Sequence, residues 1–200
     1  MIVNGWRLPD GEQHFVKHAE RNKYQANLLN AALPFVVQLR TAVDIGAHVG
    51  FHTRKMLGVF DDVWAFEPVP ENYECLRHNA PDARCVRVAL GNQRGDVHLS
   101  CPTPGNSGAW ERDDGGRHVA PLMLLDDYPI GEVDFVKIDV QGMEADVLKG
   151  GENTIRRWKP IIAIEVVMRG EVNPAVAPIL DAWGTKHLAT VGKDIIVGWP

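Results

Sequence analysis

The stretch from residue 41 to residue 53, TAVDIGAHVGFHT, constrains the fold more than any other part of the chain. Small and branched apolar residues lead to Asp44, Gly46 and Gly50 follow four residues apart, and a helical pattern comes next. This order predicts a buried parallel strand, a tight turn and the beginning of a helix. Because the first backbone N–H groups of a helix have no partner within it, we expect this junction to face a cleft and bind a ligand.

Two common phosphate-binding motifs do not match this turn. The dinucleotide fingerprint G-x-G-x-x-G needs glycine where this chain has His48 and Phe51, and a P-loop needs a lysine directly before Thr53. The remaining pattern, D-x-G-x-x-x-G, fits a ligand without phosphates such as S-adenosylmethionine, with Asp44 facing its ammonium side. The alternative is a plain strand-to-helix turn, because glycine-rich turns often match by chance.

Composition indicates one domain over residues 1–200. The chain has 200 residues, 45% of them hydrophobic, and a formal net charge of −5, which gives no overall attraction to nucleic acid or anionic membranes. Its three cysteines lack metal or redox spacing and indicate reduced thiols. Without a visible signal peptide, transit peptide or membrane-spanning apolar run, we expect a cytoplasmic protein.

Strand and helix patterns alternate along most of the chain, which predicts a mostly parallel sheet covered by helices. After the strand that begins at Thr41, further core strands are expected at 62–66, 85–88, 133–140 and 161–167, and a closing hairpin at 188–191 and 195–199. Helices are expected at 20–33, 51–59, 71–79, 143–158 and 174–183, with an interruption at Gly150-Gly151.

Two segments lie outside this alternation. In residues 1–40 we expect a hairpin that turns at Pro9-Asp10-Gly11, then the helix with Tyr24 and Leu28 on its apolar face, then a helical turn from Phe35 to Leu39. Residues 92–126 read as a β-rich insertion, with strands at 96–101 and 119–125 around a polar, glycine-rich stretch. This insertion could form a ribbon or a lid over the cleft, and Ala89 to Asn92 reads as the loop that leads into it.

Glu67 is placed by its spacing. It lies 21 residues after Gly46, at the end of the strand expected at 62–66. In doubly wound sheets an acidic residue at this place accepts hydrogen bonds from ribose hydroxyls, and a carboxylate offers two acceptor oxygens. The alternative is an ordinary exposed glutamate before Pro68. The spacing indicates a nucleoside without deciding which one.

Charged residues also occur in the strand expected at 133–140. Lys137 and Asp139 share one face of it, and a buried lysine needs a carboxylate partner, either Asp139 or Asp44. Asp139 and Glu165 both lie at the carboxyl edge of the sheet, where ligands bind in this architecture. The alternative is a purely structural ion pair. We predict Asp139, with Glu165 as second candidate, as the base that orients or deprotonates an acceptor. A divalent metal between them has no evident third ligand, so we predict none.

Several stretches together resemble the FkbM-type family of S-adenosylmethionine-dependent methyltransferases. They are, in chain order, VDIGAHVGFHT, FEPVPENYECLRHN, VALGN, NSG, VDFVKIDVQGMEADVLKGG and PIIAIE. The resemblance covers roughly residues 41–167. It implies the class I methyltransferase fold, a Rossmann-like three-layer α/β sandwich whose seven-stranded sheet is mostly parallel with one antiparallel strand. It also implies methyl transfer to a hydroxyl, often on sugars or polyketide-like natural products.

The resemblance also implies residues for the S-adenosylmethionine site. Those residues are Asp44, Gly46, His48 and Glu67, with the neighbouring Ala47, Gly50 and Pro68, then Ala89 and Leu90 near adenine, and Asp139 near the transferred methyl group. Gln141 departs from the family, which usually has Glu at that position, so any role that needs a charge there is in doubt.

Three functions stay open at this stage. We favour a methyltransferase acting on a hydroxyl of a small molecule, such as a sugar, glycan or natural product. A nucleic-acid methyltransferase is disfavoured by the acidic charge and by the lack of the N/D-P-P-Y/F tetrapeptide, so we expect neither nucleic acid nor membrane as a partner. A non-catalytic S-adenosylmethionine-binding module would bind the cofactor without forming a product. The acceptor's identity and the oligomeric state are not determined by the sequence.

Overall fold

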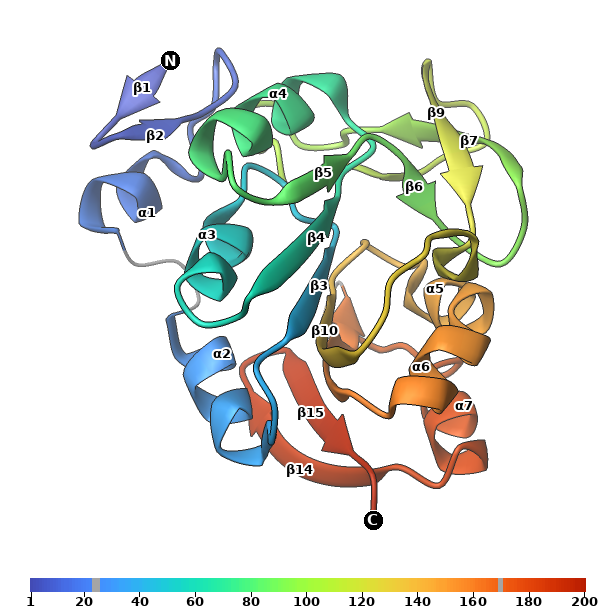
Figure 1. Cartoon of the computed structure of the whole chain (residues 1–200). Coiled ribbons are helices and arrows are strands. Elements are labelled where there is room, and N and C mark those ends of the chain that lie inside the picture. The colour runs from blue at the N-terminus through green and yellow to red at the C-terminus, as the bar shows by residue number, and fades with distance from the viewer. Residues whose placement is uncertain (23–25, 169–170) are drawn as a thin grey trace.

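The computed structural model describes residues 1–22, 26–168 and 171–200, so the expected core residue Tyr24 lies outside the described residues. Within these ranges the largest sheet has seven strands in the order β14-β15-β11-β10-β3-β4-β5 (Figure 1). The five neighbouring strands β11, β10, β3, β4 and β5 pair in parallel, whereas β15 runs antiparallel to both of its neighbours. The predicted sheet, mostly parallel with one antiparallel strand, is confirmed.

The strand bounds follow the predictions closely. They are β3 Thr41–Ile45, β4 Asp62–Phe66, β5 Arg84–Val86, β10 Val133–Ile138, β11 Ile161–Glu165, β14 Lys186–Val191 and β15 Asp194–Gly198. Every residue of β3 is buried, as expected for a central strand of a sheet covered on both faces. The strand predicted to reach residue 167 ends at Glu165, because Val167–Met168 (β12) pairs instead with Glu171–Val172 (β13).

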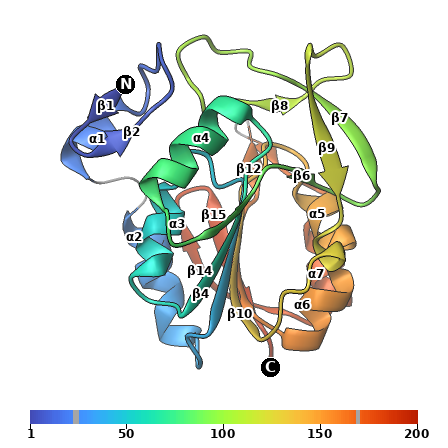
Figure 2. The same cartoon turned by 45° about the horizontal axis from the view of Figure 1, so that its top comes forward.

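Helices cover both faces of the sheet and complete three layers (Figure 2). On one face lie α2 (Ala26–Ala32), α3 (Phe51–Leu57) and α4 (Pro70–Asn79), and on the other α5 (Glu144–Gly150), α6 (Glu152–Trp158) and α7 (Ala177–Ala182). Buried apolar side chains fill the space between each layer and the sheet. No helix within the described ranges combines the length and the apolar character needed to cross a bilayer.

The predicted interruption at Gly150-Gly151 is confirmed, since α5 ends at Gly150 and α6 begins at Glu152. A Cβ atom on Gly150 would lie 1.8 Å from the carbonyl oxygen of Gly91. The chain at Gly91 therefore passes too close to this helix for any side chain, and only glycine fits.

A second sheet lies at the carboxyl ends of the core strands and, in the described part of the chain, contains β6-β9-β7-β8. Its strands are β6 Ala89–Leu90, β7 Gly95–Ser100, β8 Glu111–Arg112 and β9 His118–Met123. The strands predicted at 96–101 and 119–125 are thus present within one residue or two of their predicted bounds. The predicted exit loop is wrong at Ala89 and Leu90, because these buried apolar residues pair in parallel with Leu122 and Met123.

The N-terminal hairpin turns at a different place from the one predicted. Strand β1 (Ile2–Val3) pairs with β2 (Trp6–Arg7) through Asn4-Gly5, and both turn residues have positive φ. Asn-Gly is the favoured pair for such a two-residue turn, so it closes the hairpin before Pro9-Asp10-Gly11 is reached.

The helix predicted over residues 20–33 is also not continuous. Helix α1 (Val16–Arg21) ends where Asn22 takes a left-handed conformation with φ of 49°, and the described part of α2 covers Ala26–Ala32. Leu28 and Leu29 are buried in α2, as predicted. The predicted turn from Phe35 to Leu39 is replaced by a short 3-10 helix, η1 (Leu33–Phe35).

Candidate active site

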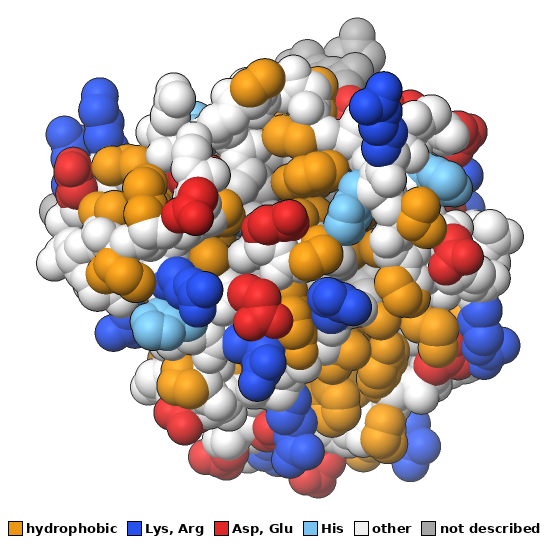
Figure 3. Space-filling view, turned by 90° about the horizontal axis from the view of Figure 1, so that it is seen from above, with side chains coloured by type: hydrophobic (Ala, Val, Ile, Leu, Met, Phe, Trp, Pro, Cys, Tyr) orange, Lys and Arg blue, Asp and Glu red, His pale blue; other side chains and the backbone are white. Residues whose placement is uncertain are grey.

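A cavity of about 450 Å³ opens at the carboxyl ends of β3, β4, β10 and β11. Its wall is built by the ends of these strands, by the turn after β3, by the second sheet and by the N-terminal segment. The volume suits a small-molecule ligand, and the position is the usual one for ligands in open α/β sheets. Figure 3 views the molecule from this end and shows acidic, basic and histidine side chains among apolar ones.

The turn between β3 and α3 is closed by hydrogen bonds within the protein. The backbone N–H groups of Gly46 and Ala47 both donate to the carbonyl oxygen of Phe66 at 3.0 Å, and that of Gly50 donates to Ala47 at 2.9 Å. The expectation that N–H groups of this turn stay unpaired for a ligand is therefore wrong at these positions. The reason is that the turn folds back onto the end of β4.

Gly46 also brings the turn into contact with the end of β10. Its φ is 77°, and a Cβ atom on it would lie 1.8 Å from the carbonyl oxygen of Asp139. The N–H of Asp139 in turn donates to the carbonyl of Ile45 at 3.0 Å. The glycine thus allows β3 and β10 to deliver their last residues to the same point on the cavity wall.

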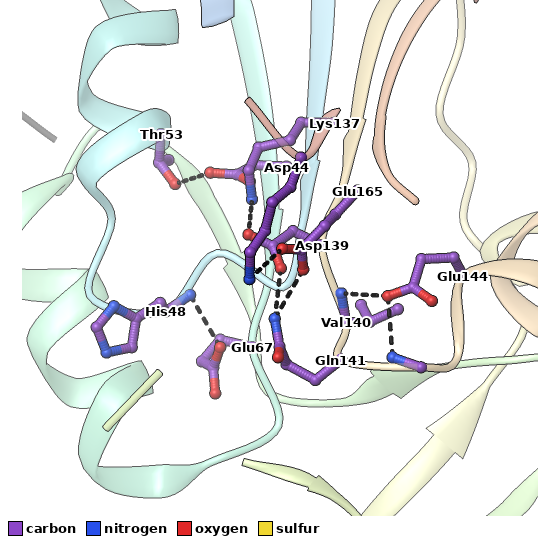
Figure 4. Close-up of polar contacts among 12 residues, drawn as sticks. Asp44, His48, Thr53, Glu67, Lys137, Asp139, Val140, Gln141, Glu144 and Glu165 are labelled. Atoms are coloured by element: carbon purple, nitrogen blue, oxygen red, sulfur yellow. Dashed lines mark hydrogen bonds and ion pairs between the residues drawn. The ribbon is translucent and has the colours of Figure 1, made fainter. Parts of the chain in front are cut away.

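Glu67 lies on this wall at the end of β4. It is 5% exposed, and its carboxylate accepts the N–H of His48 at 2.9 Å (Figure 4). It also accepts the N–H of Val69 at 2.9 Å and the side-chain amide of Asn72 at 3.4 Å. Burial raises the pKa of Glu67 to about 7, although these donors act in the opposite direction. The acid is therefore held rigidly at the place where the spacing predicts a ribose-binding group.

Asp44 lies inside the protein and does not line the cavity. It is fully buried, and the Thr53 hydroxyl donates to its Oδ2 at 2.7 Å. The ammonium of Lys137 lies 3.4 Å from Asp44 Oδ1 and 3.5 Å from Asp139 Oδ2. Both predicted carboxylate partners of Lys137 thus contact it, and Asp44 supports the lysine from within the sheet.

Asp139 and Glu165 lie together on the cavity wall and are bridged by Gln141. The Gln141 amide donates to Asp139 Oδ1 and to Glu165 Oε2, each at 2.9 Å (Figure 4). Burial raises the pKa of Asp139, but the Lys137 ammonium and hydrogen bonds from Glu165 and Gln141 outweigh it and hold this pKa below its usual range. Burial and the charge of Asp139 raise the pKa of Glu165 to about 8.

These opposite shifts separate the two acids at neutral pH, where Asp139 is ionised and Glu165 is protonated. Lys193 lies 3.5 Å from Glu165 Oε1, but its side chain is 60% exposed and its effect is screened by water. The two acids therefore differ in charge although they lie side by side. Among the described residues, no group of three or more His, Cys, Asp and Glu side chains is arranged to hold a metal ion.

The N-terminal segment and the insertion also reach the cavity, although neither Glu12 nor Phe15 is among the predicted site residues. His48 Nε2 lies 2.6 Å from the Ser107 hydroxyl, and the Ser107 N–H donates to Glu12 Oε2 at 2.7 Å. Glu12 is 4% exposed and also accepts the N–H of Phe15 at 2.8 Å. Burial lowers the pKa of His48 to about 4, so this histidine is neutral at neutral pH. Since Glu12 and Ser107 are far apart in the chain, no local pattern signals their contact.

The predicted site residues thus fall into two groups. Those that line the cavity are Gly46, His48, Glu67, Pro68, Ala89, Leu90, Asp139 and Glu165. Those that lie behind its wall are Asp44, Ala47 and Gly50. The predicted functions of all these residues stay predictions.

Parts of this chain are similar in sequence to known proteins. The family model described as the methyltransferase FkbM domain matches residues 44–184. The hexuronic acid methyltransferase AglP of Haloferax volcanii is 26% identical over 121 residues, which are 56% of this chain and 50% of that protein. The chain therefore matches only half the length of this curated relative.

Solved structures share the fold. Methyltransferase FkbM from Methylobacillus flagellatus KT has a TM-score of 0.57 and 20% identity, over 80% of this chain and 43% of that one. Precorrin-6y C5,15-methyltransferase from Geobacter metallireducens has a TM-score of 0.54 and 18% identity, over 88% and 86% of the two chains. At these identities the structures support the class I methyltransferase fold alone. Because the family model spans most of its length, the chain belongs to the FkbM family of methyltransferases.

Proposed function

We propose that this chain transfers a methyl group from S-adenosylmethionine to a hydroxyl of a small molecule, most readily a sugar or glycan. The observation that carries the proposal is the charge and hydrogen bonding of the cavity wall. Glu67, Asp139 and Glu165 line it, and of these Asp139 is ionised at neutral pH, while the turn amides that a phosphate would need are used within the protein. Such a wall disfavours phosphorylated nucleosides and favours a cationic one.

The residues present fit S-adenosylmethionine. Glu67 is fixed by backbone donors on one side of the cavity and offers acceptor oxygens of the kind that ribose hydroxyls need. The apolar residues Ala89 and Leu90 also line the cavity, as an adenine ring requires. When bound, S-adenosylmethionine supplies an electrophilic methyl group on a positively charged sulfur.

Asp139 is the better of the two candidate bases. An alcohol is a weak nucleophile at neutral pH, so a carboxylate within hydrogen-bond reach should hold its hydroxyl and accept its proton. Asp139 is ionised and held by Lys137, whereas Glu165 carries a proton that it must lose first. We therefore assign proton acceptance to Asp139 and a supporting position to Glu165.

The sugar class of acceptor is supported by AglP, whose name states that it methylates a hexuronic acid, although it matches only part of this chain. The net charge of −5 does not favour a nucleic-acid acceptor.

Cys75, Cys85 and Cys101 are free thiols, which supports a reducing compartment, and we propose that the reaction takes place in the cytoplasm.

Two measurements test the proposal. Calorimetry with S-adenosylmethionine, S-adenosylhomocysteine, NAD and ATP should give binding of the two sulfur nucleosides and none of the phosphorylated ones. Incubation with methyl-labelled S-adenosylmethionine and separate sugar, lipid and nucleic-acid fractions should place the label in an ether of the sugar fraction. Binding of NAD or ATP with exclusion of the sulfur nucleosides would overturn the proposal. Label in nucleic acid would favour that alternative, and binding without any product would favour the non-catalytic module.

A further inference from the structure

Gln141 contacts both acids of the cavity wall through one nitrogen atom. Its Nε2 lies 2.9 Å from Asp139 Oδ1 and 2.9 Å from Glu165 Oε2. Figure 4 shows its side chain reaching to both carboxyl groups from the loop that follows β10. A single amide group therefore fixes the relative position of side chains that come from two different strands.

The backbone at Gln141 is held in an unusual conformation. Its φ is 51°, in the left-handed region that side chains other than glycine rarely adopt. Glu144 accepts the N–H groups on either side, from Val140 at 3.3 Å and from Gly142 at 3.0 Å, and Asn173 donates to its other oxygen at 3.1 Å. The loop thus contains a strained residue, and hydrogen bonds to Glu144 fix the backbone on both sides of it. An observed strain of this kind beside a cavity is a reason to look for a function.

The charges around the two acids explain what the amide does there. The titratable groups that act on this pair are Lys137 on β10, Lys193 and Asp194 from the β14–β15 hairpin, His48 and His52 from the turn and α3, and Asp44 through Lys137. Burial lowers the pKa of both histidines, so they add little positive charge at neutral pH. Carboxyl groups therefore outnumber ammonium groups around this wall.

A glutamate at position 141 would place a third carboxyl group against Asp139 and Glu165. Like charges this close cannot all be ionised unless a proton or a cation joins them. The amide of Gln141 instead donates hydrogen bonds to both oxygens, which favours their ionised forms. Glutamine and glutamate have nearly the same shape, so the difference between them here is one of charge.

We propose that Gln141 is a positioning residue, whose amide holds Asp139 and Glu165 together as one acid pair. A glutamate at position 141 would need a proton or a divalent cation at the place that this amide donor fills. The use of this pair in methyl transfer rests on the proposed function. The hydrogen bonds from Gln141 to the two acids are present without any ligand, so the proposal is tested on the ligand-free protein.

Carbon-13 NMR of the side-chain carboxyl groups follows the protonation of the pair in the ligand-free protein. Gln141→Met keeps the length of the side chain without its donor, and Gln141→Glu adds the charge. Gln93→Met is the matched control, because Gln93 is exposed and lies outside the cavity wall. We expect Gln141→Met to raise the apparent pKa of the pair by about one unit or more, Gln141→Glu to raise it further, and the control to leave it unchanged. A wild-type titration in Gln141→Met would overturn the proposal, even if Gln141→Glu fails to fold.

Magnesium distinguishes this positioning role from that of a residue that only packs against the acids. In Gln141→Glu, millimolar MgCl₂ should lower the apparent pKa of the pair towards the wild-type value, because the cation replaces the added proton. Wild type and Gln141→Met should not respond. An equal response in wild type would show that the amide does not take the place of a cation. Since neither experiment uses cofactor or acceptor, their outcome is separate from that of the methyl-transfer test.

Discussion

The carboxylate of Glu67 accepts the backbone N–H of His48 at 2.9 Å, and this contact ties the end of β4 to the turn after β3. Glu67 therefore has two effects that distinguish this turn from a phosphate-binding turn. It accepts a turn amide, and it leaves a buried carboxyl group on the wall of the cavity. The turn is consequently less suited to a phosphate group than to a ligand group that donates hydrogen bonds to Glu67.

Replacing Glu67 by glutamine tests this relationship. The amide of Glu67→Gln cannot accept from both His48 and Val69, so one buried N–H loses its partner. The amide is also a weaker acceptor for a ribose hydroxyl than the carboxylate. A hydrogen bond to a charged group contributes about 1.5–3 kcal/mol, so we expect the affinity for S-adenosylmethionine to fall about ten- to hundredfold in calorimetry. Glu74→Gln, at an exposed position of α4, is the control. Equal affinities of wild type and Glu67→Gln would remove Glu67 from the cofactor site.

Gly46 and Gly184 form a matched pair for testing the close contact between the turn and the end of β10. Their φ values are 77° and 74°, but a Cβ on Gly46 would lie 1.8 Å from the Asp139 carbonyl, whereas nothing lies within 4 Å of one on Gly184. Gly184→Ala should cost about 1 kcal/mol of unfolding free energy, the strain of the left-handed conformation alone. Gly46→Ala should cost more than about 4 kcal/mol or prevent folding. Similar losses in urea unfolding would show that β10 can move away from the turn.

Much of this molecule is predictable because its signals are local. The apolar runs, the glycine turn and the spacing from Gly46 to Glu67 define the sheet and the cavity edge within short stretches of chain. The pairing of Lys137 with carboxylates follows from the cost of burying an unpaired ammonium. These features need no knowledge of distant contacts.

The features that sequence reasoning missed depend on contacts between distant segments or on competition between nearby ones. Glu12 and Ser107 meet only when the N-terminal segment packs on the insertion. The turn amides are paired because the Phe66 carbonyl happens to be near, which a motif cannot reveal. The departure at Gln141 was visible in the sequence, but its two carboxyl partners became known only from the structure.

The Glu12 contact gives a prediction about the stretch of the insertion that reaches the cavity. Glu12 holds the Ser107 N–H from a buried position, so Glu12→Ala removes the carboxylate that accepts from this N–H and from that of Phe15. We expect a loss of about 1–3 kcal/mol in unfolding free energy and faster amide hydrogen exchange at residues 103–110. Glu20→Ala, at an exposed position of α1, should change neither quantity. Unchanged exchange at 103–110 in Glu12→Ala would show that other contacts hold this stretch.

Asp139→Asn separates proton acceptance from cofactor binding. The amide keeps the shape of Asp139 but cannot accept the proton of an acceptor hydroxyl, so turnover should fall about 10²- to 10⁴-fold. The affinity for S-adenosylhomocysteine should stay near the wild-type value in calorimetry. Asp134→Asn is the control, because Asp134 lies on the same strand and binds Arg40 away from the cavity. Methyl-label transfer at the wild-type rate by Asp139→Asn would remove this residue from the chemistry.

The pH dependence of stability offers a test of Glu165 that needs no ligand. Its pKa is raised from an ordinary value of 4.5 to about 8, so between these values the folded state holds a proton that the unfolded state has released. The contribution of Glu165 to the free energy of unfolding should therefore fall as the pH rises through this window, whereas the lowered pKa values of His48 and His52 act in the opposite direction below about pH 6.5. Asp139 and Glu12, whose pKa values are lowered, contribute stability that is lost only as the pH falls below about 4, outside the window.

Glu165→Gln has no proton to release, so its melting temperature should rise relative to that of wild type as the pH increases from about 4.5 to about 8. Glu67 and Asp194, with pKa values raised to about 7 and about 6, should leave it part of the pH dependence. Differential scanning calorimetry across this range measures the difference. Parallel curves for the two proteins would mean that Glu165 is ionised at neutral pH, and the preference for Asp139 as the base would then lose its electrostatic support.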